Sequence, residues 1–153
     1  MDTLFHKKVV FAKILNAQRK LRVLIFCILY FILSSCNLPI DSNDAKRSYK
    51  YWAGQEPPKN LKVLNGEYKQ SLHFTLEYRL YLKIAQNPSW WDSLKIQNNL
   101  VFDSAKWTPP NNCPLWFKPS LSSKKWKPID NFNNSRFLED PDKGDYYVYI
   151  EQN

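Results

Sequence analysis

A long alternation of apolar and mostly polar residues most strongly limits how this chain can fold. Even positions are apolar from Leu72 to Ile84, whereas the odd positions between them are mostly polar. A period of two is typical of a β-strand, and on a helix these even residues would scatter around the axis. We therefore predict a half-buried strand here. Because its length exceeds the usual range, we expect a bulge or bend inside it.

The segments on either side of this alternation suggest further elements. Leu61–Leu64 followed by Asn65-Gly66 predicts a hairpin, because Asn-Gly accepts the positive φ angles of a type I′ turn. Asn87 can cap the free amides of a helix and Pro88 fits its first position, so we predict a short helix over 88–98, packed against the sheet. Residues 100–102 are expected to form another strand.

The remaining segments complete an α+β fold. Tyr49, Tyr51 and Trp52 precede Gly54 in a turn-rich start to the domain. Five prolines between residues 107 and 128 predict a long ordered loop or an edge of the sheet. Residues 137–151 hold a second hairpin pattern. We predict a small antiparallel sheet with one helix packed on it, preceded by a cleaved signal peptide.

An apolar run near the N-terminus predicts where the protein resides. Val23–Leu33 is eleven residues long, about half of what a membrane-spanning helix needs. Six basic residues and one acidic residue precede it, and Ser34 and Ser35 follow it. A basic start, a short apolar core and small residues are typical of a secretory signal peptide. An uncleaved signal anchor, a buried core helix and a plain cleaved signal remain as alternatives.

Leu33, Ser34, Ser35 and Cys36 resemble the lipobox of bacterial lipoproteins. The resemblance implies that Cys36 becomes the first mature residue and carries a diacylglyceryl thioether and an acylated amino group, with fatty chains such as palmitate. Two or three acyl chains hold a protein firmly at a membrane. This organisation divides the chain into a lipoprotein signal peptide at 1–35, a lipidated flexible tether at 36–47 and one α+β globular domain at 48–153.

The mature part also resembles small uncharacterised lipoproteins of Gram-negative bacteria. The matching patterns are Asn65-Gly66-Glu67-Tyr68, His73-Phe74-Thr75 with Glu77-Tyr78, Trp116-Phe117 with Pro119, and the Tyr-rich closing strand. Such families carry no assigned activity. Asn37 is not the aspartate that enterobacterial sorting associates with retention in the inner membrane. The resemblance therefore implies a lipid-anchored protein of the cell envelope, with the outer membrane favoured over the inner membrane.

Charge and cysteine content argue against a nucleic-acid-binding protein and against a domain stabilised by disulfides. Residues 1–35 carry six of the 22 basic residues and one of the 14 acidic ones, which leaves a net charge of +3 for residues 36–153. This ordinary surface charge does not indicate a nucleic-acid partner, and Lys124–Lys127 is expected to be a solvated loop. Once Cys27 is removed with the signal peptide and Cys36 is lipidated, Cys113 has no partner for an intrachain disulfide, and we expect it to be a buried apolar residue.

Two groups of polar residues were weighed as sites. His73 and Glu77 would share one face of a strand near Arg79, as a general base or metal site would require, but a solvated sheet face is the favoured interpretation. Asp140, Asp142 and Asp145 resemble part of a calcium loop, but the glycine and the final glutamate are misplaced, so a plain turn is favoured. We therefore predict no metal and no cofactor.

Aromatic residues give the remaining candidate surface. All six tryptophans follow residue 36, and most of them are expected in the core. Trp116, Phe117 and Trp126 lie in the proline-bearing segment and are the candidate binding surface. With no recognisable catalytic set, we predict a non-enzymatic binding or accessory lipoprotein whose partners are the membrane, through Cys36, and an envelope protein or glycan. The alternatives are an immunity or inhibitor lipoprotein that binds a toxin or enzyme, a carbohydrate-binding accessory, and an envelope enzyme.

Overall fold

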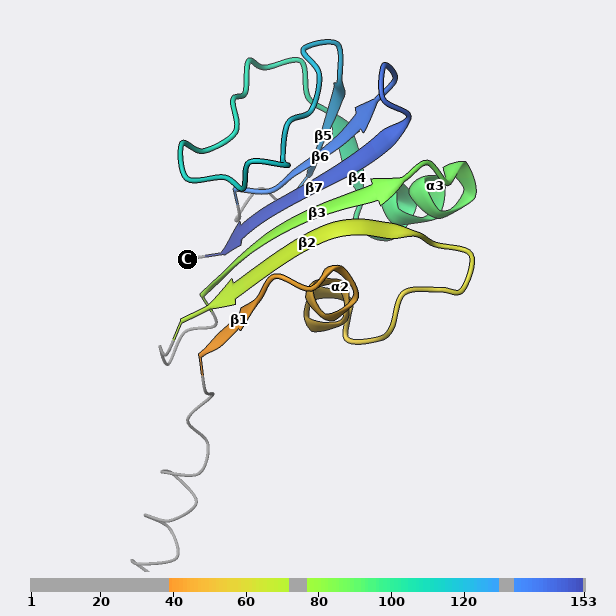
Figure 1. The fold of residues 1–153 in the computed structure, drawn as a ribbon. Coiled ribbons are helices and arrows are strands. Elements are labelled where there is room, and N and C mark those ends of the chain that lie inside the picture. The colour runs from red at the N-terminus through yellow and green to blue at the C-terminus, as the bar shows by residue number, and fades with distance from the viewer. Residues whose placement is uncertain (1–38, 72–76, 130–133, 153) are drawn as a thin grey trace, which may run out of the picture. The chain divides into compact units, whose positions relative to one another are not determined.

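The computed structural model describes residues 39–71, 77–129 and 134–152. Within these ranges the chain forms one seven-stranded sheet and two helices (Figure 1). In chain order the elements are β1 (Ile40–Ser42), α2 (Ala45–Ala53), β2 (Val63–Gln70), β3 (Tyr78–Ala85), α3 (Pro88–Gln97), β4 (Leu100–Phe102), β5 (Lys124–Pro128), β6 (Arg136–Asp140) and β7 (Asp145–Gln152).

All neighbouring strands of the sheet are antiparallel. Their order is β1-β2-β3-β7-β6-β5-β4, so the short strands β1 and β4 form the two edges and β7 lies in the middle. The predicted antiparallel sheet with helical packing is therefore confirmed. The prediction of one helix is wrong, because two helices are present. The closing hairpin is also confirmed, with Asp140 opposite Asp145 at the turn between β6 and β7.

Local sequence explains where both helices begin. Helix α3 begins at Pro88, and the side chain of Asn87 accepts a 3.1 Å hydrogen bond from the amide of Trp90, as predicted. Helix α2 begins after Asp44, whose carboxylate accepts a 2.8 Å hydrogen bond from the Arg47 amide. The helix is capped at its C-terminal end by Gly54, which has a φ of 71°. Glycine adopts this left-handed conformation without steric strain because it has no Cβ.

The folded part begins earlier in the chain than the sequence suggested. Residues 36–47 were expected to be a flexible tether, but Ile40–Ser42 pairs with β2 and α2 starts at Ala45. Helix α2 also replaces the turn-rich start that was predicted around Tyr49. The sheet therefore includes residues that precede position 48.

The predicted single strand over residues 72–84 is wrong, because the chain reverses direction there. Strand β2 ends at Gln70 and β3 begins at Tyr78, and these two residues lie opposite each other. Directly opposed residues share a face of the sheet. Beyond the irregularity at Val63/Asn65, this register pairs even positions with even positions. The alternation over 72–84 therefore matches β3, but β2 ends before it and the alternation does not reveal the reversal.

The hairpin that Asn65-Gly66 predicted is also wrong. Gly66 lies inside β2, opposite Leu82, and a register irregularity falls between Val63 and Asn65. A Cβ at Gly66 would lie 2.8 Å from the Cβ of Ser48 and 3.0 Å from the Cα of Ala45 in helix α2. Glycine is thus required because the helix crosses β2 closely, and not because the chain turns.

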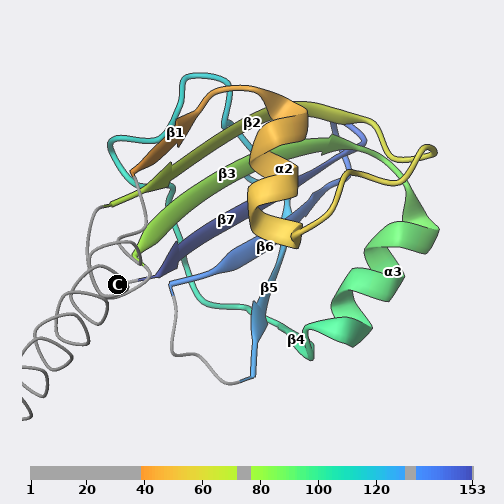
Figure 2. The same ribbon diagram turned by 90° about the horizontal axis from the view of Figure 1, so that it is seen from below.

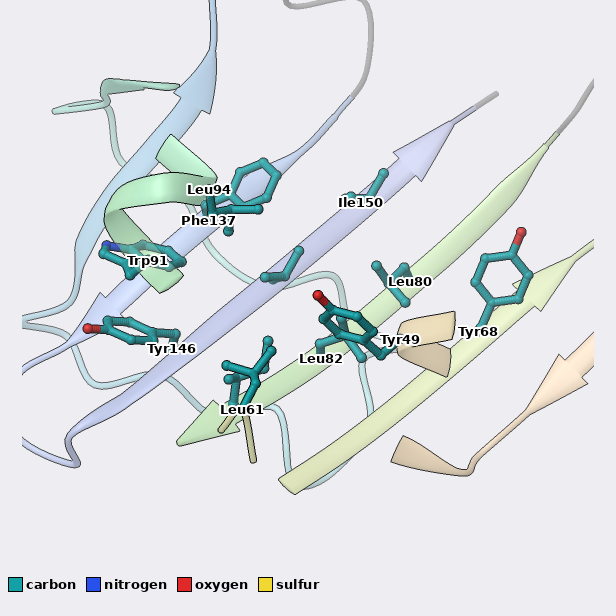
Figure 3. Packing of buried hydrophobic residues seen from close by; sticks show 12 residues of the cluster. Tyr49, Leu61, Tyr68, Leu80, Leu82, Trp91, Leu94, Phe137, Tyr146 and Ile150 are labelled. Atoms are coloured by element: carbon teal, nitrogen blue, oxygen red, sulfur yellow. The ribbon is translucent and has the colours of Figure 1, made fainter. Parts of the chain in front are cut away.

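The two helices pack on one face of the sheet, which we call the helix face (Figure 2). Trp91 of α3 is almost fully buried and stacks on Tyr146 of β7, with ring centroids 4.4 Å apart. Figure 3 shows this pair beside Leu94 and Phe137. The buried residues of the helix-face core are Tyr49, Leu61, Tyr68, Leu80, Leu82, Ile84, Trp91, Leu94, Phe137, Tyr146, Val148 and Ile150.

The segment 103–123 covers the opposite face, which we call the loop face (Figure 1). The buried residues of the loop-face core are Tyr81, Phe117, Leu138, Tyr147 and Tyr149. The predicted ordered loop is therefore present, but it ends at residue 123. Residues 124–128 form β5, which pairs with both β4 and β6 and is not an edge.

Two carboxylates fasten this loop to the sheet. Asp140 accepts hydrogen bonds from the Ser120 amide at 2.7 Å and the Ser120 hydroxyl at 2.6 Å. Asp103 lies 3.2 Å from Nε of Arg136, and both side chains are largely shielded from solvent. The Asp103 contact fixes the chain directly after β4, so it also positions the edge strand.

Candidate functional site

A groove of about 650 Å³ lies between α3 and the β4 edge of the sheet. Figure 2 shows α3 beside this end of the sheet. The lining residues come from the helix, from the turn that follows it and from strands β4 and β5: Asp92, Lys95, Ile96, Asn99, Leu100, Val101, Trp126 and Ile129. The groove therefore depends on the helix ending next to the strand it leads into.

Trp126 and Leu100 pack against the helix-face core and form the inner part of the groove. The Trp126 ring meets Phe102 edge-on at 5.8 Å, and the Nζ atom of Lys95 lies 4.8 Å from the centre of the Trp126 ring. Lys95 also forms a 2.9 Å ion pair with Asp92, one turn earlier in α3. A cation over an aromatic face is attracted by the ring quadrupole, so Lys95 is held across the groove.

Apolar side chains surround the groove and remain open to solvent. Ile96 is 77% exposed, Ile129 62%, Phe102 58% and Val101 38%. Single exposed apolar residues are ordinary, but a contiguous apolar patch with a polar rim is typical of an interaction site. Among the described residues that line the groove, only Asp92 and Lys95 are charged, and they pair with each other. The arrangement suits binding of an apolar group.

A polar cluster on the loop face lies on the central strands β3 and β7. Arg79 donates to Oε1 of Glu151 from Nε at 3.0 Å and also from Nη2. The Tyr149 hydroxyl donates to Oε2 of Glu151 at 2.7 Å. This hydrogen bond, followed by those from Arg79, lowers the pKa of the Glu151 carboxyl. Burial, together with the bond to Glu151, raises the pKa of Tyr149.

A second cavity, of about 360 Å³, adjoins this polar cluster. Arg79 and Glu151 line it together with Asp41 of β1 and Lys69 of β2. Lys69 forms a 3.1 Å ion pair with Glu67. Since Arg79 is paired with Glu151 and Lys69 with Glu67, this cluster joins β3 to β7 and we regard it as structural.

Several residues that the sequence singled out lie outside the described part of the chain. These are Leu33, Ser34, Ser35, Cys36 and His73. Glu77 is described, and its carboxylate accepts a 3.4 Å hydrogen bond from Ser71. Arg79, expected beside Glu77, instead pairs with Glu151.

The aspartates of the closing turn bind groups of the protein itself. Besides the two bonds from Ser120, Asp140 accepts hydrogen bonds from the amides of Asp142 at 3.1 Å and Lys143 at 3.2 Å. Asp145 forms a 3.0 Å ion pair with Lys83. In residues 39–71, 77–129 and 134–152 no three His, Cys, Asp or Glu side chains come together as a metal site would need.

The three aromatics predicted as one binding surface do not form one. Phe117 is only 1% exposed and packs in the loop-face core, so its placement on the surface is wrong. Trp116 is half-buried beside it, with ring centroids 5.9 Å apart. Trp126 belongs to the helix face, on the other side of the sheet. Of the three, only Trp126 lines the groove.

Other sequence expectations can be placed as well. None of the six tryptophans is exposed: Trp91 is buried and the other five are half-buried. Cys113 is a half-buried free thiol that packs at the edge of the loop-face core. Neither described helix is long and apolar enough to cross a membrane.

The exposed residues of the groove were missed by sequence reasoning. Leu100–Phe102 is a short apolar run that predicts a buried strand, yet Phe102 is mainly exposed because β4 is an edge. Ile96 follows Lys95 on α3 and faces solvent. The sequence signal that could have indicated an exposed apolar residue is the position of Ile96 between the polar residues Lys95 and Gln97. Comparisons of the chain with protein families, with curated proteins and with solved structures find no match.

Proposed function

We propose that this protein is a lipid-anchored lipoprotein of the bacterial cell envelope and that its folded part binds another envelope component without catalysing a reaction. The observation that carries the anchor is the order of features at the N-terminus. A basic stretch precedes eleven apolar residues, and Leu33-Ser34-Ser35-Cys36 follows at once. An apolar run of that length cannot span a bilayer, so lipid on Cys36 would supply the attachment.

The short connection between Cys36 and the sheet supports this proposal. Only residues 37–39 separate Cys36 from β1. A link of so few residues would hold the folded part close to the bilayer that carries the lipid. Asn37 favours the outer membrane over the inner membrane, as in the resemblance drawn from the sequence.

The groove at the β4 edge supports a binding role. Most of its lining residues are apolar, and a partner would bury the exposed side chains of Ile96 and Ile129 in its lining and of Phe102 beside it. A protein partner suits these residues better than a glycan, because no tryptophan is exposed for stacking on a sugar ring. The second candidate function is therefore an immunity or inhibitor lipoprotein whose partner is a secreted toxin or enzyme. A toxin gene beside this one would favour it.

The anchor is tested by Cys36→Ala in a Gram-negative host supplied with labelled palmitate. We expect the native chain to incorporate label and to fractionate with the outer membrane, whereas Cys36→Ala should incorporate none and accumulate as the uncleaved precursor. Cys113→Ala is the matched control, because it removes the other cysteine that follows the signal and should leave labelling unchanged. Labelling of Cys36→Ala, or none in the native chain, would contradict the proposal.

A further inference from the structure

We propose that the groove binds an extended segment of a partner protein, which adds as a new strand to β4 with apolar side chains toward the helix face and carboxylates toward the loop face. This inference rests on the binding role proposed above and not on the lipid anchor. It names both the shape and the charge of the partner segment.

Backbone groups of β4 are available for such a strand. Asn99 accepts a hydrogen bond from the Ile129 amide at 3.3 Å, and the Asp103 amide donates to Lys125 at 2.8 Å. Val101, midway between them, lies opposite Lys127. Alternate residues of an antiparallel strand turn their backbone groups to the same neighbour, so residues 99, 101 and 103 face β5. The amides and carbonyls of Leu100 and Phe102 therefore point outward, at an edge of the sheet.

Side chains on the helix face of this edge are suited to apolar residues. Leu100 and Phe102 share that face with Trp126, and Phe102 and Ile96 are largely exposed beside the groove. Side chains directly across from one another on adjacent strands lie about 5 Å apart. Alternate residues of an added strand would thus contact Leu100 and Phe102 and cover Ile96.

Lysines on the loop face indicate a partner with carboxylates. Residues 103–129, which run from the end of β4 through β5, contain five lysines and one acidic residue, Asp103. The carboxylate of Asp103 forms an ion pair with Arg136. Lys125 lies opposite Leu138, a residue of the loop-face core, and Lys127 is two residues further along β5, so both ammonium groups belong to the loop face.

The same charges argue against a second copy of this chain as the occupant. Pairing of β4 with β4 of another copy would bring a second set of β5 lysines to the loop face without supplying carboxylates for either set. An acidic and apolar segment of a different protein satisfies both faces at once, as strand addition to a sheet edge requires.

The test uses the full-length protein in detergent at neutral pH and two capped peptides, one of alternating valine and glutamate and one of alternating valine and lysine. Hydrogen exchange of single amides is read by mass spectrometry. We expect the glutamate peptide to slow exchange at Leu100 and Phe102 about tenfold when its concentration is about ten times its Kd. The lysine peptide should have little effect. Amides of β1, the other edge, should exchange at unchanged rates.

Two pairs of variants distinguish strand addition from nonspecific binding of the peptide. Phe102→Pro removes an outward amide that the sheet itself does not use, so it should abolish protection, whereas Phe102→Val keeps the amide and should retain it. Lys127→Glu should weaken the preference for the glutamate peptide, whereas Lys124→Glu makes the same charge change two residues outside the β4 pairing and should not.

Three outcomes would overturn the inference. In the first, both peptides bind equally well. In the second, the glutamate peptide protects β4 with no Kd below about 1 mM. In the third, self-association protects β4 without any peptide. The result is independent of the anchor, because Cys36→Ala should lose lipid and still bind the peptide.

Discussion

The two faces of the sheet are stabilised in different ways. The helix face carries twelve buried hydrophobic residues beneath helices with their own capping residues. The loop face has a smaller core of five, and polar contacts from Asp140 and Asp103 hold its irregular cover in place. Stability on the helix face should therefore depend on the apolar volume that is buried, whereas on the loop face it should depend on a few directed hydrogen bonds and on pH.

The largest effect is expected from Trp91→Ala on the helix face. Trp91 is almost fully buried and stacked on Tyr146, so its removal leaves a large cavity. We expect a loss of about 3–5 kcal/mol in the free energy of unfolding, measured by urea denaturation. Trp107→Ala is the control on the loop face, where Trp107 is half-buried and should cost much less. Equal costs would remove the distinction between the two faces.

Asp140→Ala should give the next largest effect, through the loop face. Asp140 is 1% exposed, and its loss leaves the amides of Ser120, Asp142 and Lys143 without their acceptor. We expect a cost of about 3 kcal/mol at neutral pH. Asp142→Ala, at an exposed position of the same turn, should cost far less.

The Asp140 contribution should also depend on pH. Burial tends to raise the pKa of this carboxyl, but the hydrogen bonds from Ser120, Lys143 and Asp142 outweigh it and lower the pKa below its usual value. A lowered pKa means that the stabilisation is present above the unfolded-state pKa of about 4 and is lost as the pH falls through the folded-state value. Asp140→Ala should therefore flatten the acid limb of the stability profile, and an unchanged limb would contradict this assignment.

A smaller effect is expected from Gly66→Ala, where α2 meets the sheet. The added methyl would lie 2.8 Å from the Cβ of Ser48, so helix and strand must move apart. We expect a cost of about 1–3 kcal/mol. Gly54→Asn is the comparison, because nothing lies near a Cβ at that position and asparagine tolerates positive φ. If thermal denaturation shows the two variants to be alike, close packing does not explain Gly66.

The smallest effects should come from two tyrosines of the loop-face core. The buried Tyr81 hydroxyl has no hydrogen-bond partner among the described residues, and burial raises its pKa to about 12. Tyr81→Phe should be neutral or stabilising by less than about 1 kcal/mol, whereas Tyr149→Phe loses its bond to Glu151 and should cost about 1–2 kcal/mol. Destabilisation by Tyr81→Phe, seen in chemical denaturation, would indicate a partner for its hydroxyl.

Short-range patterns predicted the parts of the fold that depend on short-range physics. The cap at Asn87, Pro88 and the turn between β6 and β7 were found because their residues fix the local backbone. The reversal between Gln70 and Tyr78 was missed because the register keeps even residues on one face across the turn. Gly66 was misread because its need for glycine comes from a helix about twenty residues earlier in the chain.

The groove could not be predicted in the same way. Its exposed residues become one patch only because β4 lies at the edge of the sheet and α3 stops beside it. Helix α2 was missed although Asp44 and Gly54 are typical start and stop residues, since Asp44 was assigned to the tether and Gly54 to a turn-rich start of the domain. Trp126 lines the groove although it is half-buried, and its pairing with Phe102 depends on the register of β4 and β5.

The most direct test of the proposed lipoprotein is the intact mass of the mature chain isolated from bacterial membranes. We predict a polypeptide that begins at Cys36 and exceeds the mass of residues 36–153 by a diacylglyceryl group and an amide-linked acyl chain. A mature chain that retains the residues before Cys36, or that begins at Cys36 without added mass, would contradict it.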